Sequence, residues 1–188
     1  FFYKQAQTVK NEEQQAISIL SGLNGNSLKN NTDSLKATVS QAQQHTAEAK
    51  RISHSPLWTV ASIMPYVGND VTTVRGMTEV MDDLTGNTLP GFMNIARQIS
   101  TTQLNNANGQ LNLQAIANVQ DEFVKTNQQL QRQREKYGNL PTPKIKIVAS
   151  AYQQGRDKLD DLAQTVDGMN SAMQMVPELL GQNGARTY

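Results

Sequence analysis

The chain contains no cysteine, few aromatic residues and no long apolar run, and these absences exclude several kinds of site and classes of protein. Without cysteine there is no disulfide scaffold, no thiolate metal site and no thiol catalysis. No apolar run approaches the roughly 18 residues that span a bilayer. The 17 basic and 16 acidic side chains give a net charge of +1, which predicts no general attraction to nucleic acid or to anionic lipid.

Amide side chains supply most of the polarity that is present. The sequence has 21 glutamines and 17 asparagines, against 18% charged residues and 37% hydrophobic residues. A chain of 188 residues normally buries about 70% of its unfolded surface, so one hydrophobic core is expected. We therefore treat residues 1–188 as a single domain.

Turn signals divide the chain into segments of helical length. They lie at residues 24–26, 54–56, 65–70, 85–91, 105–110 and 138–143. The segments between them have apolar residues at helical spacing, and none alternates as a strand would. Because short connections make neighbouring helices antiparallel, we predict an all-α fold: an elongated up-and-down multi-helix bundle with long antiparallel helices.

The last segment has the clearest periodicity. Its apolar positions follow a 3-4 spacing at Ile145, Val148, Tyr152, Gly155, Leu159, Leu162, Val166, Met169, Met173 and Val176. This spacing predicts one unbroken helix from about Lys144 to Val176, which Pro177 should end. Between Asp70 and Leu104 we expect two shorter helices, the second beginning at Thr88 to Pro90.

No residue pattern indicates catalysis, a cofactor or a metal. His45 and His54 have no further ligands at metal-site spacing, so both are interpreted as structural or solvated. Adjacent acids on a helix point about 100° apart, which is wrong for a shared catalytic proton. The acid pairs, interpreted as solvated helix faces, are Glu12–Glu13, Asp82–Asp83, Asp121–Glu122 and Asp160–Asp161. We predict a non-enzymatic chain without cofactor, metal or catalytic residues.

One cluster of basic residues interrupts the general neutrality around the 138–143 turn. It comprises Arg132, Arg134, Lys136, Lys144 and Lys146. Basic residues in the last turn of a helix interact favourably with the helix dipole, which accounts for Arg132, Arg134 and Lys136. Lys144 and Lys146 begin the next helix, where that explanation has the wrong sign, so contact with a polyanion such as an anionic cell-wall polymer is the alternative.

The segment PLWTVASIMPYVG (56–68) is uncharged and apolar. The opening FFYK is typical of the interfacial end of a membrane helix, and a helix of about 23 residues climbs about 35 Å before the next returns. The segment would then come back to the lipid surface, with candidate membrane-proximal contacts at Leu57, Trp58, Ile63, Met64 and Tyr66. The alternative is that it plugs the open end of the bundle core.

Two stretches, residues 56–84 and VPELLGQNGARTY (176–188), resemble the bacterial family known as domain of unknown function 4012. The resemblance is carried by the Pro-x-Val-Gly turn and the Pro-Glu-Leu-Leu-Gly stretch, together with Asp70, Arg75, Arg186 and Tyr188. It implies a membrane-anchored protein of the Gram-positive cell envelope, with a membrane helix before residue 1 and a further domain after residue 188. It brings no catalytic residues.

These observations lead us to expect a non-enzymatic extracytoplasmic stalk or interaction domain at the cell membrane. Its expected partners are the membrane, a downstream domain of the same protein, and a cell-wall polymer or protein, with no nucleic acid. The alternatives are a receptor-like ectodomain for a small ligand and an accessory protein in envelope polysaccharide export or attachment. A polar cavity lined by Gln120, Asn127 and Arg134 would favour the receptor, and a continuous dry seam would favour the stalk.

Overall fold

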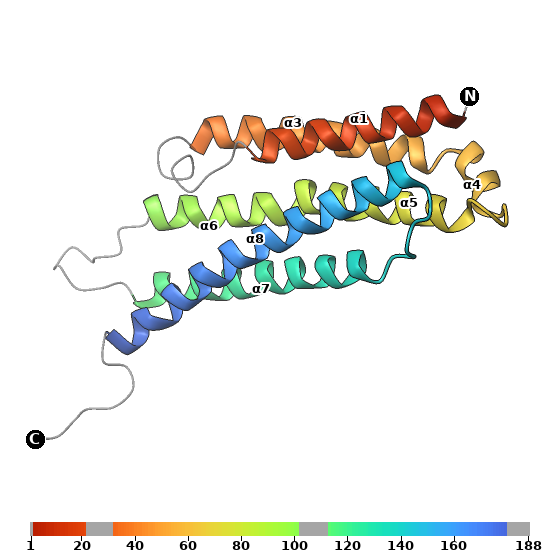
Figure 1. Cartoon of the computed structure of the whole chain (residues 1–188). Helices are drawn as coiled ribbons and strands as arrows, with labels where there is room; N and C mark the ends of the chain where they lie inside the picture. The colour runs from red at the N-terminus through yellow and green to blue at the C-terminus, as the bar shows by residue number, and fades with distance from the viewer. Residues whose placement is uncertain (1, 22–31, 102–112, 180–188) are drawn as a thin grey trace, which may run out of the picture.

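Long helices arranged roughly antiparallel make up the part of the chain that the computed structural model describes, residues 2–21, 32–101 and 113–179 (Figure 1). No strand occurs within these ranges, so the predicted all-α bundle is confirmed. The elements are α1 (Phe2–Ser21), α3 (Thr32–Ser53), α4 (Pro56–Ser62), α5 (Gly68–Asp83), η1 (Leu84–Thr88), α6 (Leu89–Thr101), α7 (Leu113–Gly138) and α8 (Lys146–Leu179).

Helices α1 and α3 pack side by side along one edge of the bundle, and α8 crosses the other helices obliquely (Figure 1). Small residues make the close approach of α1 and α3 feasible, because Ala16, Ala42 and Ala49 are almost fully buried.

The predicted turn at 85–91 is wrong, because α5, η1 and α6 form one continuous helical rod. The π-helical segment η1 has a wider turn than an α-helix, and it carries the chain through Gly86 to Pro90 without a break. Tertiary contacts hold this segment, since the hydroxyl of the fully buried Thr85 lies 2.7 Å from that of Thr46 on α3, and the Thr88 hydroxyl donates to the Gln133 side chain at 3.0 Å. The predicted turns at 54–56, 65–70 and 138–143 are confirmed, and those at 24–26 and 105–110 lie outside the described residues.

Helix α8 is unbroken, as predicted, but it continues through Pro177 to Leu179. The expected stop at Pro177 is therefore wrong. A proline removes one backbone donor, and here only two helical residues follow it, so little of the helix depends on that hydrogen bond.

The hydrophobic core falls into two clusters. The larger runs along α5, η1, α6, α7 and α8 and consists of Met77, Val80, Met81, Leu84, Ile95, Val119, Phe123, Leu130, Tyr137, Leu159, Ala163 and Val166. The smaller lies at the α4 end and consists of Val9, Ala49, Trp58, Ala61 and Val71. The second cluster positions the surface described next.

Candidate functional site

Helix α4 lies at the same end of the bundle as the start of α1 (Figure 1). The indole nitrogen of Trp58 donates to the side-chain oxygen of Gln5 at 3.2 Å, which ties the two elements together. The first two long helices therefore run out and back, as the sequence predicts.

The sequence forms α4 for local reasons. Ser55 has an extended backbone at φ −66° and ψ 157°, and Pro56 follows at the start of the helix, where its missing N–H is not needed. Trp58 and Ala61 are spaced by three residues and face the core, while Leu57 and Val60 face outward.

Five large apolar side chains are exposed on α4 and on the connection to α5. We call this surface the α4 tip: Leu57 (38% exposed), Val60 (61%), Ile63 (81%), Met64 (53%) and Tyr66 (91%). Residues 56–69 contain no Asp, Glu, Lys or Arg. The α4 tip is therefore an uncharged apolar surface at one end of the bundle.

Trp58 was predicted to be a membrane-proximal contact, and the structure contradicts this. Its side chain is 1% exposed and packs in the smaller core cluster with Val9 and Val71. A buried indole contributes a large apolar area, and Gln5 satisfies its N–H group. The alternative of a core plug thus holds for Trp58, while Leu57, Ile63, Met64 and Tyr66 are exposed.

The connection between α7 and α8 is fastened to the start of α5. One carboxylate oxygen of Asp70 accepts from the backbone N–H groups of Lys144 at 2.9 Å and Ile145 at 2.8 Å. The Thr73 hydroxyl donates to the Pro141 carbonyl at 2.5 Å. These contacts bring Lys144 and the start of α8 to the end of the bundle that carries the α4 tip (Figure 1).

The motif glycine Gly68 also has a steric reason to be there. A Cβ at this position would overlap the backbone carbonyl oxygen of Ser62. Gly68 and Asp70 therefore shape the path of the chain from α4 into α5.

The predicted basic cluster is divided between two environments. Arg134 binds Asp160 at 2.7 Å and Lys136 binds Glu79 at 2.9 Å, so both have carboxylate partners. Arg132, Lys144 and Lys146 are exposed and form no ion pair among the described residues.

A polar cavity lined by Gln120, Asn127 and Arg134 together, which would favour the receptor alternative, is not found among the described residues. Asn127 accepts a hydrogen bond from Gln131 at 3.3 Å, and of the three predicted residues Arg134 alone lines the open polar pocket of about 430 Å³ between α7 and α8. The pocket also contains Arg156 and Asp160.

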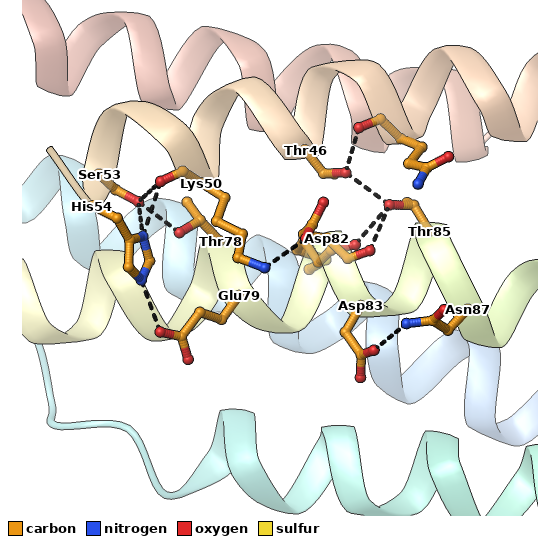
Figure 2. A network of polar contacts seen from close by, with 12 residues as sticks. Thr46, Lys50, Ser53, His54, Thr78, Glu79, Asp82, Asp83, Thr85 and Asn87 are labelled. Atoms are coloured by element: carbon orange, nitrogen blue, oxygen red, sulfur yellow. Dashed lines mark hydrogen bonds and ion pairs between the residues drawn. The ribbon is translucent and has the colours of Figure 1, made fainter.

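The two histidines lie in separate side-chain pairs. His45 Nδ1 lies 2.6 Å from Glu12. His54 Nε2 lies 2.8 Å from Glu79 (Figure 2). The hydrogen bond from Lys136, followed by that from His54, lowers the pKa of Glu79 despite partial burial. No group of three or more side chains that could hold a metal ion occurs within the described ranges.

A row of polar contacts joins α3 to α5 and η1, and the sequence patterns did not indicate it. The hydroxyls of Thr46 and Thr85 lie 2.7 Å apart, and the Lys50 amine lies 2.7 Å from the Asp82 carboxylate. Figure 2 shows both contacts. Thr46 and Thr85 are both buried. This interface is therefore not a dry seam, and its hydrogen bonds help to set the register between the helices.

The interpretation of Glu13 as part of a solvated face is wrong. Glu13 is 6% exposed, and its Oε1 atom has no hydrogen-bond partner among the described residues. Burial, with a smaller contribution from the charge of Asp82, raises the pKa of Glu13 to about 8, so the carboxyl is mostly neutral at pH 7. Its spacing from Val9 and Ala16 is the sequence signal that places it on the buried face of α1.

Two apolar cavities lie between the helices, one toward each end of the bundle. One of about 240 Å³ lies at the α4 end, between α1, α4, α5 and the start of α8. The other, of about 360 Å³, lies toward the opposite end, between α1, α3, α6 and α8.

Among the described helices, none combines the length and apolarity that crossing a bilayer requires. No family model matches the chain, and neither a curated protein nor a solved structure matches it.

Proposed function

We propose that this chain is a non-enzymatic helical domain that rests on a membrane surface through the α4 tip. The observation that carries the proposal is the exposure of five large apolar side chains on an uncharged segment at one end of the bundle. An apolar surface of this kind is unfavourable in water, and the headgroup and upper acyl region of a bilayer remove it from water. Tyr66, 91% exposed, suits the interfacial level, where tyrosine is enriched.

Three exposed lysines support an anionic lipid surface as the partner. Lys4 lies near the start of α1, Lys144 lies two residues before α8, and Lys146 is the first residue of α8. Both helices begin at the end of the bundle that carries α4 (Figure 1). None of them forms an ion pair within the part of the chain that is described. A basic side chain near an anionic membrane contributes about 1 kcal/mol to binding.

In this arrangement the bundle stands off the lipid as a stalk or interaction domain. The resemblance to the domain of unknown function 4012 family supports an extracytoplasmic position in a cell envelope, with a downstream domain and a cell-wall polymer or protein as partners. The alternative role in polysaccharide export or attachment rests on that resemblance alone.

A receptor-like ectodomain is the second candidate. The observation that favours it is the pair of apolar cavities, which have room for small ligands between the helices.

Flotation with lipid vesicles tests the proposal. The wild-type domain should float with vesicles that contain phosphatidylglycerol, and Ile63→Asp should reduce the bound fraction because it places a charge in the α4 tip. Ile99→Asp is the matched control, since Ile99 is also exposed (44%) but lies on α6, toward the other end of the bundle. Equal flotation of all three proteins, or none by the wild type, would contradict the proposal.

A further inference from the structure

The smaller cavity lies directly behind the α4 tip. Its volume is about 240 Å³, and its apolar walls come from four elements: Ala6, Val9, Trp58, Val71, Ile147 and Val148. An apolar cavity of about 150 Å³ is large enough to hold benzene, so this one has room for a stretch of alkyl chain.

The charged groups around the cavity leave its interior apolar. Glu13 borders the cavity, and burial keeps its carboxyl mostly neutral at pH 7. Asp70 also borders it. One of its oxygens accepts two backbone hydrogen bonds from the residues just before α8, and the other, Oδ2, has no hydrogen-bond partner among the described residues but exposes almost no surface to the cavity. Lys10 is half-buried beside the cavity, where a long aliphatic stem can contribute apolar wall while its amine reaches water. The walls therefore suit a hydrocarbon rather than a polar ligand.

Two of the residues that line the cavity lie next to exposed side chains or are exposed themselves. Val67 lines it and directly follows Tyr66 of the α4 tip, and Tyr3, which is 71% exposed, lines it from α1. The larger cavity lies toward the opposite end of the bundle and has no such relation to the tip.

On the premise of the proposed function, we infer that this cavity takes up one acyl chain of a bilayer lipid. The α4 tip would bring the domain onto the lipid, and the chain would enter beside Tyr3 and Val67 to lie against Trp58. Uptake removes apolar surface of both the chain and the cavity from water. The domain would then hold an individual lipid as well as touch the membrane.

Quenching of Trp58 by brominated lipid tests the inference, because bromine on an acyl chain quenches indole emission on contact. Trp58 is the only tryptophan and borders the cavity, and because it is 1% exposed, quenching by lipid that touches the α4 tip alone should be weak. Vesicles with brominated chains should cause a loss of Trp58 emission relative to unbrominated vesicles, at equal flotation. The cavity-filling variants Val148→Phe and Ala6→Leu should float like the wild type but lose the quenching.

The outcomes separate this inference from the proposed function. Flotation without quenching of the wild type would overturn the acyl-chain site and leave the membrane contact standing. Absence of flotation would overturn both. Quenching that persists fully in a cavity-filling variant with unchanged circular dichroism would show that lipid reaches Trp58 by another route, which also overturns the site.

Discussion

Gly155 on α8 lies directly against the side chain of Tyr137 on α7. The Tyr137 ring stacks on Tyr152, with centroids 5.1 Å apart, and its hydroxyl donates to the Tyr152 carbonyl at 3.1 Å. A Cβ at position 155 would overlap the Tyr137 hydroxyl. This contact fixes how closely α7 and α8 approach.

Gly155→Ala should therefore destabilise the domain although alanine is the better helix former. Alanine gains about 1 kcal/mol of helix propensity over glycine, but the overlap costs about 1–3 kcal/mol. Gly168→Ala on the same helix is the control, because a Cβ there meets nothing within 4 Å and should stabilise the fold. Urea denaturation measures both, and equal stability of the two variants would refute the proposed packing.

Leu159→Asp should unfold the domain or lower its melting temperature strongly. Leu159 is 2% exposed, and burying an unpaired carboxylate costs several kcal/mol. Met169→Asp is the matched comparison, since Met169 belongs to the same series of apolar positions at 3-4 spacing in α8 but is 40% exposed. Thermal unfolding followed by circular dichroism should show a small change for Met169→Asp, and an unchanged melting temperature for Leu159→Asp would refute the core assignment.

Glu13 should make the domain less stable as pH rises. Burial raises its folded-state pKa from 4.5 to about 8, so between these values the unfolded chain is ionised while the folded chain retains the proton. The stabilisation is complete below pH 4.5 and declines toward pH 8, by up to about 1.4 kcal/mol for each pH unit.

The control for this effect is Glu13→Gln, whose side chain does not titrate. The neighbouring groups Lys10, Asp82 and Tyr137 remain in both proteins, so the difference between the two stability curves isolates residue 13. That difference should shift in favour of the variant from pH 5 to pH 8. Parallel curves would show that Glu13 titrates normally.

The buried hydroxyls of Thr46 and Thr85 should be energetically coupled. The two hydroxyls share one hydrogen bond, and valine at either position removes it. Each hydroxyl also lies near a backbone carbonyl, that of Gln43 for Thr46 and that of Met81 for Thr85. Thr46→Val and Thr85→Val should each cost about 1 kcal/mol, and the double variant should cost less than the sum. A double-mutant cycle from urea denaturation measures this, and strictly additive losses would disprove the coupling.

The helices were predictable because their periodicity is local to the sequence. The spacing of Leu159 and Val166 identified α8, and the turn residues around Asn139 and Pro141 identified its separation from α7. The rod through η1 was not predictable from the same signals. Gly86 and Pro90 normally mark a break, and packing of the buried threonines of η1 against α3 and α7 overrides that local preference.

The candidate site was predictable as a segment but not residue by residue. Absence of charge in residues 56–69 indicated an apolar surface, yet it cannot tell which side chains of a short helix face inward. Trp58 faces the core and donates a hydrogen bond to Gln5, whereas Ile63, directly after α4, is 81% exposed. The cavity behind the tip depends on elements far apart in sequence, which periodicity within one helix does not report.

Membrane contact of the α4 tip is the central claim, and one labelling measurement tests it most directly. Since the chain has no cysteine, Ile63→Cys carries an environment-sensitive nitrobenzoxadiazole label at a single site, and Ile99→Cys carries it on α6 as the reference. On addition of vesicles that contain phosphatidylglycerol, the label at residue 63 should brighten and shift to the blue, while the label at residue 99 should not change. No change at residue 63, or the same change at both residues, would contradict the claim that this domain rests on lipid through the α4 tip.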